Sequence, residues 1–122
     1  MNRIATSALL NLMEQTGLDV ATLAEGLDEA DLRRSRLIRA ELLRQLRLMA
    51  GSAVAVPLSA RTNMPELDWE GWRLLALRLQ AEAGGDLDDA LWFALHSVVP
   101  ATLLWLRVYR QNHPQLFVMA PG

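Results

Sequence analysis

The feature that most constrains the fold is an uncharged, strongly apolar stretch, "ALWFALHSVVPATLLWL", which covers residues 90 to 106. A membrane-spanning helix needs about 20 such residues, and this stretch is shorter and contains His96 and Pro100. We therefore expect a buried helix of a cytoplasmic protein with no membrane association. Apolar residues continue on both sides of Pro100, so the proline predicts a kink and not an end. The last helix, which contains this stretch, is expected to be apolar nearly all round, with one narrow polar strip of Asp89, His96 and Arg107.

The rest of the chain also predicts helices, because the alternation of apolar and polar residues that is typical of strands is absent. The region around residues 35–56 has two opposite faces, each spanning an arc of about 80° on a helix. The apolar face consists of Ile38, Leu42, Leu46, Met49, Ala53 and Val56. The opposite face carries arginines, namely Arg33, Arg36, Arg44 and Arg47.

Glycine and proline mark the expected helix boundaries in the first half of the chain. A helix over about residues 2–16 is expected to end at Gly17. A short helical piece follows and ends at Gly26. A long helix then begins near Asp28 or Asp31 and is stopped by Pro57, which cannot continue a helix.

The second half predicts two further helices. Asp68 is expected to be the N-cap of a fourth helix, which the pair Gly84–Gly85 closes. Asp86 then opens a last helix that runs to about Arg110. The tail over residues 111–122 contains two prolines and is expected to be irregular.

Composition limits the classes of function. A chain of 122 residues predicts one domain, with its core between about residues 4 and 110. The 52% of hydrophobic residues argues against disorder, and the net charge of −2 argues against a generally cationic nucleic-acid binder. The absence of Cys excludes disulfides and thiol nucleophiles. Only two isolated histidines, His96 and His113, are present, so we expect no metal site and no cofactor.

The fourth helix, "DWEGWRLLALRLQAE", is unusually apolar for a helix at the surface of a bundle. Leu74 and Leu77 lie away from its main apolar side, and only Arg78 and Glu82 indicate a side that is clearly exposed to solvent. A small bundle has little room for such a helix beside the apolar last helix, which favours a homodimer. The main apolar side consists of Trp69, Trp72, Leu75, Ala76, Leu79 and Ala83.

The order of these pieces resembles that of the HepT-like proteins, a branch of the HEPN superfamily. The segment "SRLIRAELLRQLRLMAGSA" resembles the family's long arginine-rich helix, with Gly51–Ala53 where the family has Gly-Glu-Ala. The segment "NMPELDWEGWRLL" is similar to the start of its catalytic helix, and "DLDDALWFALHSVVPATLLWL" to its last helix. The similarity covers roughly residues 8 to 108.

The resemblance implies an all-helical, up-and-down bundle of four to five helices that dimerises. Many members are metal-independent ribonuclease toxins, each neutralised by a partner nucleotidyltransferase, with the active site in the dimer cleft. Arg73 matches the family's catalytic arginine, but Leu74 replaces its polar residue, Arg78 its histidine and Gln80 its tyrosine. The resemblance therefore implies a degenerate catalytic motif.

Each candidate site residue also has a structural interpretation. Arg78 cannot act as a base near neutral pH, although it can hold a phosphate. Arg73 is either a residual cleft residue or an arginine that pairs with a carboxylate at the surface. His96 is more often a structural residue on such a helix than a catalytic one. The arginine face is either a contact for RNA or a partner protein or, more commonly, a solvated surface. Trp69 and Trp72 favour core or dimer packing over base stacking.

Three functions remain open from the sequence. The favoured one is a HepT-like dimer without ribonuclease activity, which binds a nucleotidyltransferase in a toxin–antitoxin-type system. The second is an active metal-independent ribonuclease with a variant site of Arg73, Arg78 and His96. The third is a structural dimer unrelated to nucleic acid.

Overall fold

The computed structural model describes residues 3–81 and 84–119, and these form helices and short connections without any strand. The all-helical bundle expected from the sequence is therefore confirmed. The elements in chain order are α1 (Arg3–Ala24), α2 (Glu29–Arg34), α3 (Arg36–Ala55), α4 (Leu58–Thr62), α5 (Trp69–Arg78), α6 (Gly85–Phe93), the π-helical turn η1 (Ala94–Val98), α7 (Val99–Asn112) and the 3-10 turn η2 (Pro114–Phe117).

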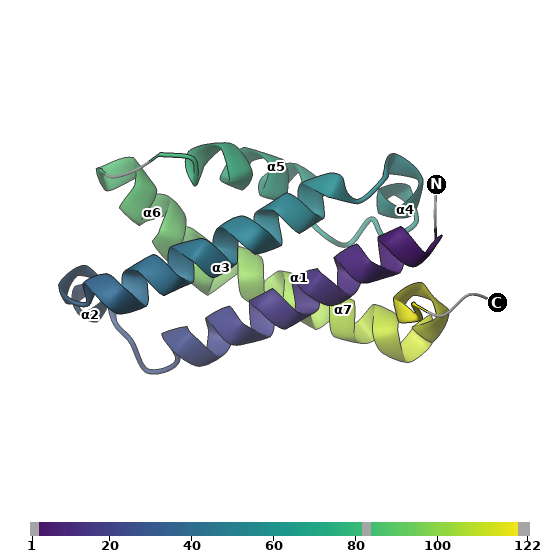
Figure 1. Ribbon diagram of the computed structural model, residues 1–122, viewed down its shortest axis with the longest axis horizontal. Coiled ribbons are helices and arrows are strands. Elements are labelled where there is room, and N and C mark those ends of the chain that lie inside the picture. Colours follow the sequence, from purple (N-terminus) through teal and green to yellow (C-terminus); the bar gives the residue numbers. More distant parts are fainter. Residues whose placement is uncertain (1–2, 82–83, 120–122) are drawn as a thin grey trace.

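The longer helices run up and down along the long axis of the molecule (Figure 1). Helices α1 and α3 lie side by side and run in opposite directions. Helix α5 runs back along one edge of α3, and α6, η1 and α7 return behind α1 and α3. The N-terminal end of α1, α4 and η2 meet at one end of the bundle, and α2 lies at the other.

Gly17 lies inside a continuous first helix and does not end it, so that prediction was wrong. A Cβ atom at this position would lie 2.8 Å from Leu103 Cδ2 and 2.9 Å from Met49 Cε. The glycine therefore lets α1 approach α7 and α3 closely. The gain from this packing outweighs the low helix propensity of glycine, which costs about 1 kcal/mol relative to alanine.

The predicted long helix over residues 28–56 is two helices, because the backbone leaves the helical conformation at Ser35. Asp28 caps α2 through a reciprocal capping box with Asp31. Ser35 ends α2 and caps α3, with its Oγ accepting a hydrogen bond from the Ile38 amide at 3.4 Å. The end of α3 before Pro57 is confirmed. The apolar face is also confirmed on α3, where its residues are buried except Ile38, which is half-buried.

The boundaries around α5 are partly as expected. Asp68 is the N-cap, with its Oδ1 accepting from the Gly71 amide at 2.9 Å. The helix ends at Arg78, well before the glycine pair, so the predicted stop was wrong. Gly84 instead begins the next helix as the N-cap of α6, with a φ of 116° that favours glycine.

The helix around Pro100 continues through a π-helical turn. The proline has no amide hydrogen, and just before it the Val99 amide donates to Ala94 O, five residues back, instead of four. Figure 1 shows α6 and α7 following different directions on either side of this turn. The tail is not wholly irregular as expected, because η2 follows α7 and buries Phe117.

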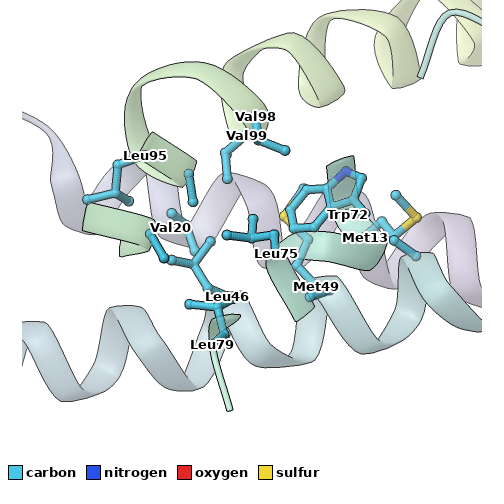
Figure 2. Packing of buried hydrophobic residues seen from close by; sticks show 14 of the residues in the cluster. Met13, Val20, Leu46, Met49, Trp72, Leu75, Leu79, Leu95, Val98 and Val99 are labelled. Atoms are coloured by element: carbon cyan, nitrogen blue, oxygen red, sulfur yellow. The ribbon is translucent and has the colours of Figure 1, made fainter. Parts of the chain in front are cut away.

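The core is formed by one face of each long helix, and Trp72 is its largest fully buried side chain (Figure 2). The Trp72 indole Nε1 donates to Thr102 Oγ1 at 3.0 Å, and Thr102 Oγ1 donates to Val98 O at 2.7 Å. The first hydrogen bond joins α5 to α7, and the second joins α7 to the π-helical turn η1 before it. The buried face of α5 is therefore bonded to α7, and its outer face carries the candidate site.

Candidate functional site on the outer face of α5

The outer face of α5 borders a groove of about 500 Å³ between this helix and α6. Leu74, Leu77 and Phe93 line it and are 48%, 55% and 51% exposed. Arg78 and Asp68 lie at the two ends of the α5 side. The groove is therefore apolar in its middle and charged at its ends. Phe93 comes from α6, and its role at this groove was not predicted from the sequence.

Arg73 is not among the residues that line this groove. It forms an ion pair with Glu70 on the preceding turn, with Nη2–Oε1 at 2.5 Å and Nε–Oε2 at 2.9 Å. The hydrogen bonds of this pair raise the pKa of Arg73 and lower that of Glu70. The Arg73 side chain is 55% exposed, so the pair contributes little to stability.

Arg78 lies on a different side of α5 from Arg73, because five residues correspond to about 140° of net helical rotation. Its Nη2 donates to Asp86 O at 3.5 Å. Glu82, which with Arg78 was expected to mark the polar edge of this helix, lies outside the described residues. Among the described residues that line the groove, Arg78 is the one cation, and none is a histidine.

His96 also lies away from the groove. It is exposed on η1, and its ring stacks against Trp92 with 3.9 Å between the ring centroids. Gln80, which stands where the family has tyrosine, is exposed and borders a separate groove with Arg47. The structure therefore does not bring His96 and Gln80 together with Arg78.

The arginine face predicted along one helix is divided between α2 and α3. Arg33 pairs with Glu29 at 2.7 Å and Arg44 with Glu41 at 2.6 Å. The second pair, with a further hydrogen bond from Gln45, lowers the pKa of Glu41 to about 2. Neighbouring carboxylates thus neutralise two of the four arginines, while Arg36 is exposed without a hydrogen bond or ion pair to another described residue.

Arg47 has a structural role that the sequence did not predict. Its Nε donates to Leu79 O at 2.8 Å and its Nη2 to Ala81 O at 3.2 Å. These carbonyls follow the end of α5, where the helix leaves acceptors without partners of its own. A cation also complements the negative end of the helix dipole. Arg47 thus ties the end of α5 to α3.

The two tryptophans have different environments. Trp72 is 0% exposed, so it belongs to the core of one subunit and is not available to a dimer contact. Trp69 is half-buried, and its Nε1 donates to Met64 O at 2.9 Å. Its uncovered part remains open to a partner. Neither tryptophan is free to stack with a base without rearrangement.

The described residues contain no cluster of three or more His, Asp or Glu side chains that could hold a metal ion. One helical stretch, Gly85–Asn112, is long and apolar enough to cross a membrane by length and composition. In this fold 39% of its most apolar window is buried. The core helices of soluble bundles satisfy the same test. Neither a protein-family model, a curated protein nor a solved structure matches the chain.

Proposed function

We propose that this chain is a HepT-like helical homodimer without ribonuclease activity, and that it acts as a binding or regulatory module. The proposed partner is a nucleotidyltransferase in a toxin–antitoxin-type system. The proposal combines the sequence resemblance with the chemistry of the α5 groove. It concerns a cytoplasmic protein that needs no cofactor.

One observation supports the proposed absence of ribonuclease activity. The groove on α5 contains Leu74 and Arg78, two of the four positions that the resemblance aligns with the catalytic motif, while Arg73 and Gln80 lie outside it. Its described lining contains Arg78 and Asp68 as the only ionisable residues. Metal-independent cleavage of RNA needs a group that exchanges a proton near neutral pH. The residues that line the groove include no histidine, the side chain that most often exchanges a proton near neutral pH. Leu74, Leu77 and Phe93 make the groove better suited to an apolar contact than to a phosphate backbone.

The homodimer is supported by the apolar surface that one subunit leaves uncovered. Leu74, Leu77 and Phe93 are each about half exposed, and Leu104 on α7 is 52% exposed. Most of the apolar window of Gly85–Asn112 also remains unburied in a single subunit. Covering such a surface with a second copy removes apolar area from water, which stabilises the assembly.

The experiment is an RNA cleavage assay with purified protein, a mixed RNA and tRNA pool, and EDTA. Wild type, Arg73→Ala and Arg78→His are compared, and the molar mass of each is measured by light scattering. We expect a dimer that does not cleave. Activity that appears in Arg78→His would show that the rest of the family's cleft is retained.

Cleavage by the wild type that is lost in Arg73→Ala would instead establish the active ribonuclease with a variant site. Co-purification with a nucleotidyltransferase, without any cleavage, would support the proposed partner. A monomer that neither cleaves nor binds RNA or such an enzyme would contradict the proposal.

A further inference from the structure

A second groove lies at the end of the bundle where α1 begins and where α4 and η2 approach it (Figure 1). Its volume is about 230 Å³. It is distant in the sequence from the α5 groove, and its lining has a different character. The polar side chains that line it are Arg3, Thr6, Ser7, Ser59, Asn63 and Gln115.

Ser7 is the unusual residue of this lining. It is 1% exposed, and its Oγ has no hydrogen-bond partner in the part of the chain that the structure describes. Other hydroxyls on the helices behave differently. Five of them donate to the carbonyl four residues earlier, namely Thr16, Thr22, Ser52, Thr62 and Thr102. A buried hydroxyl without a partner is unfavourable and uncommon, and a bound molecule is one way to satisfy it.

The charge of the residues that line the groove indicates which class of ligand it can bind. Arg3 supplies a guanidinium, and no Asp or Glu is among the residues that line the groove. The Arg3 Nη2 makes one long hydrogen bond, 3.4 Å to Gln115 O, which leaves most of its donors available. A guanidinium binds a carboxylate through two parallel hydrogen bonds. A single cation balances a single negative charge.

The remaining lining is apolar, with Leu10, Met64 and Leu116 beside the polar groups. Leu10 and Met64 are fully buried and form the core beneath the groove, whereas Ala60 and Leu116 are half-buried and present apolar surface to it. The groove has room for a small molecule and not only for a single water.

We propose that this groove binds a small monocarboxylic acid with an apolar body. The carboxylate contacts the Arg3 guanidinium and accepts a hydrogen bond from the Ser7 hydroxyl, and the body lies against Ala60 and Leu116. The proposal is independent of the function proposed for the α5 groove. It assigns a role to a buried hydroxyl that the fold itself does not use.

The test is an NMR titration of the full chain with sodium hexanoate, with 1-hexanol as the neutral control at the same ionic strength. We expect saturable shifts of the amide signals of Ser7, Asn63 and Leu116 with hexanoate and much weaker ones with hexanol. Ser7→Ala should weaken hexanoate binding by about tenfold to 100-fold, as the loss of one hydrogen bond to a charged group predicts. Arg3→Gln should abolish saturation.

Ser52→Ala is the matched control, because Ser52 is also a buried helical serine but donates to Leu48 O at 2.8 Å. It should lower the melting temperature and leave hexanoate binding unchanged. Ser7→Ala should not lower the melting temperature, since its hydroxyl has no protein partner to lose.

Three results would each overturn the proposal. The first is the absence of saturable shifts with hexanoate. The second is equal binding of hexanoate and hexanol with no effect of Arg3→Gln, which would show an apolar patch alone. The third is a loss of melting temperature in Ser7→Ala as large as that in Ser52→Ala, which would show that the Ser7 hydroxyl already has a partner in the protein.

Discussion

Replacing Thr102 with valine tests the contact that holds α5 against α7. The substitution keeps the branched shape of the side chain but removes the acceptor of the Trp72 indole hydrogen bond, 3.0 Å long in the structure. Trp72 is 0% exposed and Thr102 2% exposed. Water therefore cannot replace the lost acceptor without opening the core.

The expected loss follows from two opposing effects. An unpaired buried donor costs about 1–3 kcal/mol. The new methyl group buries apolar surface and recovers up to about 0.8 kcal/mol. We expect Thr102→Val to lower the free energy of unfolding by about 1–2 kcal/mol, which corresponds to a fall in melting temperature of roughly 3–10 °C for a domain of this size.

Urea denaturation followed by tryptophan fluorescence measures this loss. Thr16→Val is the matched control, because Thr16 is 3% exposed and its Oγ1 also donates to the carbonyl four residues earlier, at 2.7 Å. Thr16 accepts no side-chain hydrogen bond comparable to that from Trp72, so its replacement should cost less than about 0.5 kcal/mol. Equal losses in the two variants would refute the argument that the indole hydrogen bond carries the effect.

The remaining predictions concern backbone crowding, a titration and the end of α5. Gly51→Ala, at an exposed helical position with nothing within 4 Å of the new Cβ, should stabilise by about 0.5–1 kcal/mol. Gly17→Ala gains the same propensity but crowds its neighbours, so urea denaturation should show it at least about 1 kcal/mol less stable than Gly51→Ala; equal values would contradict this. Burial and the adjacent Glu66 raise the pKa of Tyr109, the single tyrosine of the chain, to about 12. Its contribution to stability is therefore present below its ordinary pKa of 10.0 and lost as pH rises towards 12. Ultraviolet titration should show a lower tyrosinate midpoint in Glu66→Gln, and an unchanged midpoint would exclude that carboxylate as a cause. Arg47→Ala should lower the free energy of unfolding by about 1 kcal/mol, since it frees two carbonyls beyond the end of α5; no change would show that water replaces both bonds.

Local chemistry predicted several elements correctly. The spacing of Leu42, Leu46 and Met49 predicted the buried face of α3, because a helix places such positions on one side whatever its neighbours are. Asp68 as an N-cap and Pro57 as a stop follow from hydrogen bonds and steric limits within a few residues. These predictions depend only on residues that are close to one another in the sequence.

Other features were decided by distant residues. Gly17 predicted a helix end, but its close contact with Leu103 and Met49 keeps α1 continuous. The end of α5 at Arg78 is joined to α3 through Arg47, a partner far away in the sequence. For the candidate site, the residue types along α5, such as Leu74 and Arg78, were visible in the sequence. The placement of Phe93 at the groove, and of Arg73 and His96 outside its lining, was not.

The sequence by itself determined that the chain is helical and which faces of its helices are apolar. These follow from residue type and the helical period. Only the tertiary structure decided that Trp72 is a core residue bonded to Thr102, and that Ser7 is buried without a partner beside Arg3. Both features depend on packing between segments that are far apart in the chain. The residue type of a serine or a tryptophan does not indicate which distant side chains will lie next to it.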